Sequence, residues 1–330
     1  MKKIIKQSVR YLLFLSIGLG LLYLVFKDQD FNLLWQDIKG ANYYYIVLSM
    51  TVGYLAIVSR GLRWNILLKP LGYTPKKWNS IHAVTIGYFA NLAVPRIGEV
   101  TRCTALNQAE KIPVDKLFGT VLLERVIDSA ILLSLLVITF FMKIDLFTSF
   151  IKSAFESRSG EIVIKPIHYV IFGVLLVMVI TFLAYRKKII KSPWFQKVKA
   201  FFLGIAEGFK TIKKIEKKSL FIFHTLFIWT MYLLMAYVCF FAFSATSMLN
   251  LGDGLFVTIV GGLGMIAPAP GGIGSYHAAV IAGLTALEID GNVARSFAVV
   301  VHSAQTLMMV ISGLVAIIAL SLSRRKAAKA

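Results

Sequence analysis

The sequence is short of cysteine and of acidic residues. Its two cysteines, Cys103 and Cys239, form no CxxC pair, so we expect neither a disulfide framework nor a metal site. Only 16 Asp and Glu stand against 36 Lys and Arg, which gives a formal net charge of +20. Such a charge often indicates nucleic-acid binding, but here the basic residues lie between long apolar runs rather than on a soluble domain. We therefore expect no nucleic-acid partner, and because no nucleotide-binding loop is present we predict no cofactor.

Charged residues of either sign are scarce. They make up 16% of the chain, whereas 58% of the residues are hydrophobic and the mean hydropathy is +0.75. A soluble globular domain carries about 25% charged residues, so this composition excludes one. We expect an all-α polytopic membrane protein in which residues 1–330 form a single membrane domain.

About six apolar stretches are suited to cross a bilayer as helices. A crossing needs about 20 predominantly apolar residues, and these stretches occupy residues 11–26, 43–59, 117–142, 166–185, 219–245 and 296–322. The second is followed by Arg60, Arg63 and Trp64, residue types that suit the membrane interface. Residues 11–142 are predicted to form a first half of the membrane domain and residues 219–322 a second half.

Two further apolar stretches are interrupted before they can cross. In the first, residues 79–110, a proline and several charged residues follow Asn91 within one hydrophobic thickness. In the second, residues 255–288, prolines and glycines separate two short apolar arms. No arm is long enough to span alone, so we predict that each stretch is a re-entrant helical hairpin, which enters and leaves by the same face.

The orientation follows from the basic residues. With the amino terminus in the cytoplasm, the segments assigned inside hold 28 Lys and Arg and those assigned outside hold 7, which satisfies the positive-inside rule. This predicts a multi-pass protein of the cell (inner, cytoplasmic) membrane with both termini in the cytoplasm. The two hairpins then enter from opposite faces and form an inverted repeat, an architecture typical of alternating-access carriers.

The predicted cytoplasmic loop, residues 186–218, contains eleven Lys or Arg with aromatic residues between them. One interpretation is a helix that lies on an anionic leaflet and binds anionic lipid. The other is a solvated positive loop that only sets the orientation. The sequence favours neither.

The interruptions supply candidate ligands for a lipid headgroup. In each hairpin the second helix begins inside the membrane, where its free N–H groups favour an anion. Arg96 and Arg102 offer guanidinium groups to a phosphodiester, and Ser275 is expected to cap the second helix of its hairpin. The predicted headgroup-binding residues are Asn91, Pro95, Arg96, Glu99, Arg102, Glu124, Arg125, Asp128, Pro270, Gly271, Gly272, Gly274, Ser275 and His277.

The charged members of this set have a second interpretation. Glu124 and Asp128 are neighbours on one helix face, and Arg125 lies beside Asp128. Together with Arg96, Glu99 and Arg102 they make three positive and three negative charges, which can neutralise each other as a buried ion network that fixes the first hairpin. Both roles stay open at this point.

Three motifs carry a family resemblance. They are the polar interruption from Asn91 to Arg102, E-R-x-x-D from Glu124 to Asp128, and P-x-P-G-G-I-G-S from Pro268 to Ser275. In this order they resemble the lysylphosphatidylglycerol synthase transmembrane region family of flippase-like membrane proteins. The resemblance implies transfer of a lipid between leaflets, with a phospholipid as the partner, and a homodimer.

Two departures limit what the resemblance implies. The residues up to Ala330 contain no aminoacyltransferase domain, so we do not expect synthase activity. His277 stands where the family is expected to have a glutamate, so specificity for a cationic headgroup is not carried over.

We therefore predict a lipid translocase that moves a phospholipid or another lipid with an anionic headgroup, and not an enzyme. No catalytic residue is assigned. Two alternatives remain. One is a membrane-embedded glycosyl or acyl transferase that uses Glu99, Glu124 or Asp128 as acid or base. The other is a carrier for a small soluble anion with the same hairpin architecture.

Overall fold

A computed structural model of the chain describes residues 31–146, 215–267 and 269–327, with seven single positions between 16 and 27. These residues are helical or lie in turns and connections, and none of them forms a strand. They fall into two compact units, Met1–Glu124 with Lys214–Ala330 and Arg125–Lys213. The predicted span 166–185, most of the span 11–26 and the basic loop as far as residue 214 lie outside the described residues.

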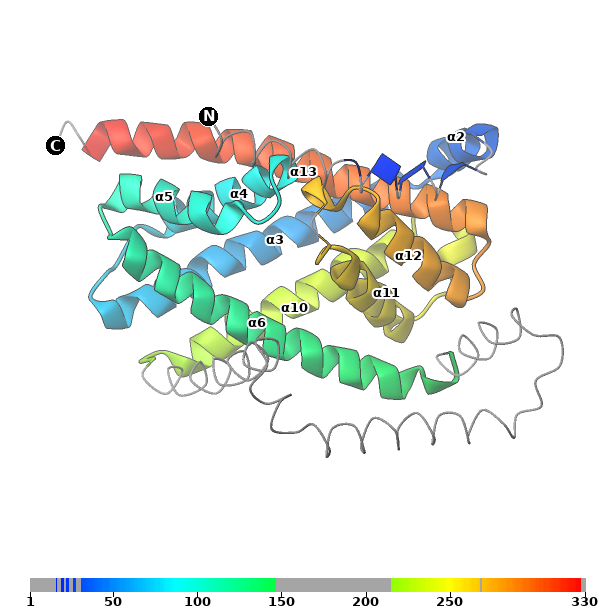
Figure 1. Cartoon of the computed structure of the whole chain (residues 1–330), viewed down its shortest axis with the longest axis horizontal. Helices are drawn as coiled ribbons and strands as arrows, with labels where there is room; N and C mark the ends of the chain where they lie inside the picture. Colours follow the sequence, from blue (N-terminus) through cyan, green and yellow to red (C-terminus); the bar gives the residue numbers. More distant parts are fainter. Residues whose placement is uncertain are drawn as a thin grey trace, which may run out of the picture. The chain divides into compact units, whose positions relative to one another are not determined.

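The helices are labelled as in Figure 1. The first unit contains α2 (Phe31–Gly40), α3 (Tyr43–Leu68), η1 (Lys69–Leu71), α4 (Lys77–Ala93), α5 (Gly98–Glu110), α10 (Lys218–Phe240), η2 (Ser244–Thr246), α11 (Leu251–Gly264), η3 (Pro270–Gly272), α12 (Ser275–Ala286) and α13 (Gly291–Ala327). Helix α6 (Val114–Met142) begins in the first unit and continues into the second.

Three described helices are long and apolar enough to cross a membrane. They lie within Tyr43–Leu71, Lys218–Phe240 and Gly291–Arg324. The chain is therefore an α-helical membrane protein, as its composition predicts. The total of six spans stays a prediction.

Helix α3 is longer than its sequence suggests. The predicted span 43–59 forms the first part of α3, and the helix continues to Leu68 and buries Arg60, Arg63 and Trp64. These side chains find polar partners inside the protein; for example, Trp64 Nε1 donates to Thr120 Oγ1 at 2.8 Å. A buried polar group that is hydrogen-bonded does not require the helix to end.

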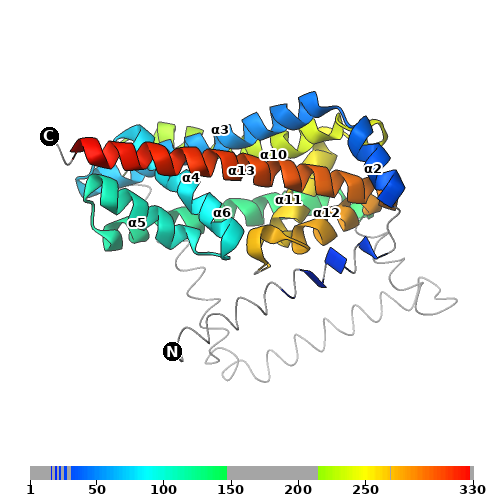
Figure 2. The same ribbon diagram turned by 90° about the horizontal axis from the view of Figure 1, so that it is seen from above.

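Helices α3 and α10 lie side by side (Figure 2). The Ser49 hydroxyl donates to the Met235 carbonyl at 2.8 Å, and Ser59 Oγ lies 2.8 Å from His224 Nδ1. Interhelical hydrogen bonds and close approach at small residues are typical of membrane helix pairs, in which apolar burial alone gives no preference for protein over lipid.

Each predicted hairpin is a pair of packed helices, α4 with α5 and α11 with α12 (Figure 1). Glycines allow the close approach in both pairs. A Cβ added at Gly87 would lie 2.8 Å from the Gly98 carbonyl oxygen, and one at Gly264 would lie 2.7 Å from Ala279 Cβ. Helix α13 packs against α4, α5 and α12, so it contacts both hairpins. The re-entrant placement of the hairpins stays a prediction.

Gly61 on α3 gives the first testable prediction. A Cβ at this buried position would lie 2.7 Å from Ile81 Cα on α4, which is backbone and cannot rotate away. We expect Gly61→Ala to lower the free energy of unfolding by about 1–3 kcal/mol, because overpacking forces the two helices apart. Thermal unfolding of the purified protein in detergent measures this change.

The matched control is Gly119→Ala on α6, where an added Cβ meets nothing within 4 Å. Alanine favours the helical conformation more than glycine does, so we expect this substitution to be neutral or to stabilise the fold by up to about 1 kcal/mol. Equal unfolding midpoints for the two variants would contradict the tight α3–α4 contact.

Candidate functional site

The two interruptions of the hairpins face each other. We call residues 94–97, between α4 and α5, break 1, and residues 265–274, between α11 and α12, break 2. Arg96 Nη2 in break 1 donates to the Ile266 carbonyl in break 2 at 3.0 Å. A Cβ added at Gly271 in break 2 would lie 3.5 Å from Leu92 Cδ2 at the end of α4. Segments 170 residues apart in the chain are thus in direct contact.

Break 1 is built by local sequence. Helix α4 ends at Ala93, and Val94 takes an extended conformation before Pro95, as the steric restriction on a residue preceding proline favours. Arg96 has a φ of 64°, which is unusual for a residue with a side chain. The Asn91 side-chain oxygen accepts a 2.7 Å hydrogen bond from the Gly98 N–H. The first N–H of α5 is therefore satisfied by the protein itself.

Break 2 depends on glycine. Gly271, Gly272 and Gly274 have φ values of 59°, 76° and 81°, a region that residues with a Cβ rarely adopt. The prediction that Ser275 caps α12 is wrong, because Gly274 is the N-cap and the Ser275 hydroxyl donates to the Gly272 carbonyl at 3.3 Å. Instead, His277 Nδ1 accepts from the Gly274 N–H at 3.4 Å.

A histidine pair fixes break 2 to α13. His302 Nε2 lies 2.9 Å from the Gly271 carbonyl oxygen, which only accepts, so this nitrogen carries the proton. The ring centroids of His277 and His302 are 4.6 Å apart, and the Tyr276 ring lies 5.2 Å from that of His302. The backbone conformation of the glycine loop is thus tied to α13, a candidate span, through the His302 side chain.

A cavity of about 350 Å³ lies between the two breaks. Its lining combines hydrogen-bonding groups with flexible apolar ones. The polar or aromatic lining residues are Tyr88, Asn91, Arg96, Glu99, Tyr232, Tyr276, His302, Gln305 and Thr306, and the methionines are Met235, Met265, Met308 and Met309. Within the described ranges, no group of three or more His, Cys, Asp or Glu side chains is arranged to hold a metal ion.

Several hydroxyl and amide groups of the lining are held by hydrogen bonds to neighbouring helices. The Tyr88 and Tyr232 hydroxyls are 3.1 Å apart, and Arg60 Nη2 donates to the Tyr232 hydroxyl at 3.4 Å. Gln305 Nε2 donates to Ser49 Oγ at 3.1 Å. Helices α4, α10 and α13 thus present polar groups to one cavity, and Arg60 and Ser49 on α3 hold two of these groups from behind the lining.

A buried ion cluster lies apart from the cavity lining. Glu124 on α6 forms ion pairs with Arg102 on α5 and with Arg63 on α3, the latter with 3.5 Å between Nε and Oε1. All three side chains are buried, and the Arg102 guanidinium carbon lies 4.7 Å from the centre of the Trp64 ring. This arrangement joins α3, α5 and α6. Of the six charges in the predicted ion network it contains Arg102 and Glu124, and its third member, Arg63, was not part of that prediction.

The predicted site residues therefore divide into groups. Asn91, Pro95, Arg96, Glu99, Gly271 and Gly272 line the cavity, whereas Pro270, Gly274, Ser275 and His277 belong to break 2 or the start of α12 without lining it. Arg102 and Glu124 belong to the ion cluster, and Arg125 and Asp128 follow on the part of α6 in the second unit.

Sequence reasoning missed Tyr88, Tyr232 and Arg63. The tyrosines lie inside apolar helices, where nothing in the local sequence marks them. Arg63 carries a signal, because an arginine so close behind an apolar run needs either the interface or a buried partner.

Comparison with known proteins identifies relatives of the chain. The family model described as the lysylphosphatidylglycerol synthase TM region matches residues 11–313. A UPF0104 membrane protein of Methanocaldococcus jannaschii is 30% identical over 145 residues, which represent 42% of this chain and 42% of that relative. The match thus spans less than half the length of the relative. No solved structure matches the chain.

Proposed function

Because the chain belongs to the lysylphosphatidylglycerol synthase TM region family, we propose that it moves a phospholipid, or another lipid with an anionic headgroup, between the two leaflets without altering it chemically. The observation that carries this proposal is the cavity between break 1 and break 2. Two helix interruptions that meet at a cavity are the usual substrate site of an alternating-access carrier.

The size of the cavity favours a headgroup as its occupant. At about 350 Å³ it is at the small end of ligand cavities, which measure about 300–1,000 Å³. It has no room for two acyl chains, which stay in the surrounding lipid in this proposal. Methionine side chains adapt to irregular shapes, so Met235, Met265 and Met308 provide a surface along which the glycerol end of a lipid can slide.

Arg96 is the proposed phosphate ligand. It lines the cavity and now donates to the Ile266 carbonyl, an uncharged acceptor. A phosphodiester accepts two parallel hydrogen bonds from a guanidinium group and binds it more strongly than a carbonyl does. Binding of a headgroup would therefore break the hydrogen bond between Arg96 and the Ile266 carbonyl. The loss of this bond would link substrate binding to the separation of the two breaks.

The proposed topology completes the carrier. Six helices span the cell membrane, both termini lie in the cytoplasm, the α4–α5 hairpin enters from the cytoplasm and the α11–α12 hairpin enters from outside. The excess of basic residues on the assigned cytoplasmic side supports this arrangement. Alternate opening of the two hairpins would expose the cavity to one leaflet at a time.

Reconstituted liposomes test the proposal. A fluorescent phospholipid in the inner leaflet is protected from a membrane-impermeant quencher until it is moved to the outer leaflet. We expect wild-type protein to expose phosphatidylglycerol and Arg96→Ala to slow the exposure about 10- to 100-fold, since a hydrogen bond to a charged group is worth about 1.5–3 kcal/mol.

Two controls separate the guanidinium from other effects. Arg96→Gly also removes the side chain but relieves the left-handed backbone at φ 64°, so equal losses in the Ala and Gly variants assign the effect to the guanidinium group. Arg295→Ala removes an arginine that does not line the cavity and should transport normally. If the lipid is recovered chemically modified and has not changed leaflet, the translocase proposal fails and the transferase alternative takes its place.

A further inference from the structure

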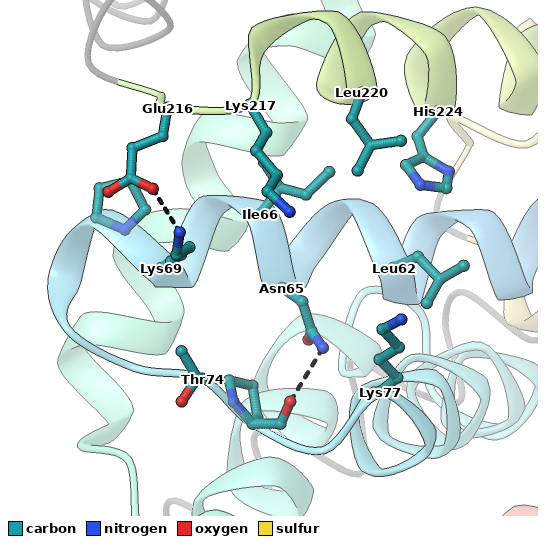
Figure 3. Close-up of a pocket in the computed structure, with 12 residues that line it drawn as sticks. Leu62, Asn65, Ile66, Lys69, Thr74, Lys77, Glu216, Lys217, Leu220 and His224 are labelled. Atoms are coloured by element: carbon teal, nitrogen blue, oxygen red, sulfur yellow. Dashed lines mark hydrogen bonds and ion pairs between the residues drawn. The ribbon is translucent and has the colours of Figure 1, made fainter.

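A second cavity lies at the ends of three helices in the first unit. It has a volume of about 420 Å³ and is enclosed by the last turns of α3, the loop before α4 and the first turns of α10 (Figure 3). None of its lining residues lines the cavity between the breaks. The candidate spans in α3 and α10 end at Leu71 and begin at Lys218. In the proposed topology this cavity therefore lies at the membrane surface.

The polar part of the lining is mostly positive. Lys69, Lys77 and Lys217 line the cavity with one acidic residue, Glu216. Lys69 donates to the Glu216 carboxylate, and this hydrogen bond lowers the pKa of that carboxyl below its usual value, so it is ionised at neutral pH. Among the described residues, neither Lys77 nor Lys217 forms an ion pair, and Lys217 acts on Glu216 only through its nearby charge.

The walls between the lysines are apolar. Leu62 and Ile66 contribute from α3 and Leu220 from α10. In Figure 3 the Lys217 side chain extends from the start of α10 and the Lys77 side chain from the start of α4, both toward the surface of α3. The Asn65 side chain donates to the Pro75 carbonyl at 3.1 Å, which holds the loop before α4 against α3.

We propose that this cavity binds one phospholipid with an anionic headgroup, whose phosphate lies between Lys77 and Lys217 and whose acyl chain begins along Leu62, Ile66 and Leu220. Two ammonium groups beside an apolar wall match the charge and polarity of such a lipid at the membrane surface. A small soluble anion would use the lysines but leave the apolar wall exposed. The site is separate from the proposed transport cavity, and its occupant is a resident lipid rather than the transported one.

Glu216 lowers the expected affinity of this site for an anionic lipid. Its carboxylate engages Lys69 and repels a phosphate. Glu216→Gln keeps the size of the side chain but releases a third ammonium group into the cavity. The variant should therefore bind the lipid more tightly, which is the opposite of what removal of a lysine does.

Native mass spectrometry of the full chain in neutral detergent measures the site. Phosphatidylglycerol and phosphatidylcholine are titrated separately, and the first bound lipid is counted. We expect wild-type protein to prefer phosphatidylglycerol, Lys77→Gln with Lys217→Gln to weaken its binding at least about tenfold, and Glu216→Gln to strengthen it. Leu220→Trp, which fills the cavity without changing charge, should also weaken binding.

The matched control is Lys116→Gln, which removes one exposed positive charge from α6 outside the cavity. Unchanged binding in this variant supports the site, whereas a loss equal to that of the double lysine variant would overturn it. Equal retention of the two lipids by wild-type protein, or displacement of phosphatidylglycerol by millimolar inorganic phosphate, would also overturn it. Arg96→Ala should bind this lipid normally, so the site can stand even if the translocase proposal fails.

Discussion

Glu124→Ala is expected to prevent stable folding of the chain. The side chain of Glu124 is fully buried and forms ion pairs with Arg63 and Arg102, which are themselves buried. Removing one partner of a buried ionic group costs about 3–5 kcal/mol, because the remaining charges lose their compensation without regaining water. A protein with a total stability of about 5–15 kcal/mol cannot lose this amount without a large drop in folded protein.

The measurement is the amount of monodisperse protein extracted from membranes, followed by thermal unfolding in detergent. Asp115→Ala is the control, because it removes an exposed carboxylate from the same helix. A combined variant with Arg63→Met, Arg102→Met and Glu124→Leu should recover much of the loss, since a buried ion cluster replaced by apolar residues of similar volume is often neutral. If Glu124→Ala unfolds at the same temperature as Asp115→Ala, the cluster has no structural role.

A disulfide between break 1 and break 2 is expected to abolish lipid movement. A Cβ at Gly271 would lie 3.7 Å from Leu92 Cα. One bond length more bounds the distance between the two Cα atoms at about 5.2 Å, which is within the Cα–Cα range of disulfides, about 4.4–6.8 Å. The variant Leu92→Cys with Gly271→Cys, made with Cys103 and Cys239 replaced by serine, should lose transport when oxidised and recover it when reduced. The proposed mechanism requires the two breaks to separate in each cycle.

The single cysteine variants, treated with the same oxidant, control for the strain of a side chain at the left-handed Gly271 and for the loss of Leu92. They should transport equally with and without reductant. Full transport by the oxidised double variant, with the crosslink verified by mass spectrometry of peptides, would mean that the breaks do not move apart.

The helical breaks could be predicted from sequence because their causes are local. Pro95 and the glycines of break 2 act on their own backbone, so the two hairpins appear in the sequence close to where the structure has them. The end of α3 could not be predicted in the same way. Arg63 stays inside the fold because Thr225 accepts its hydrogen bond at 3.2 Å, and this partner is 162 residues away.

The candidate site shows the same division. Asn91, Arg96 and Gly271 were predicted from their positions at the breaks and do line the cavity, although their role as headgroup ligands stays a prediction. The contact between the Tyr88 and Tyr232 hydroxyls joins residues 144 positions apart. A single sequence predicts which face of a helix is buried but not which helix packs against that face. The packing was therefore needed to show that Arg102 on α5 pairs with Glu124 on α6.

Helix α13 has a mechanical consequence for any such cycle. It is 37 residues long, or about 55 Å at 1.5 Å per residue, and it packs against α4, α5 and α12. At Gly313 it has no side chain, and a Cβ there would lie 2.5 Å from the Phe89 ring of α4. In the proposed mechanism, movement of either hairpin therefore slides its helices along α13. The space that Gly313 leaves fixes the position along α13 at which the Phe89 ring packs.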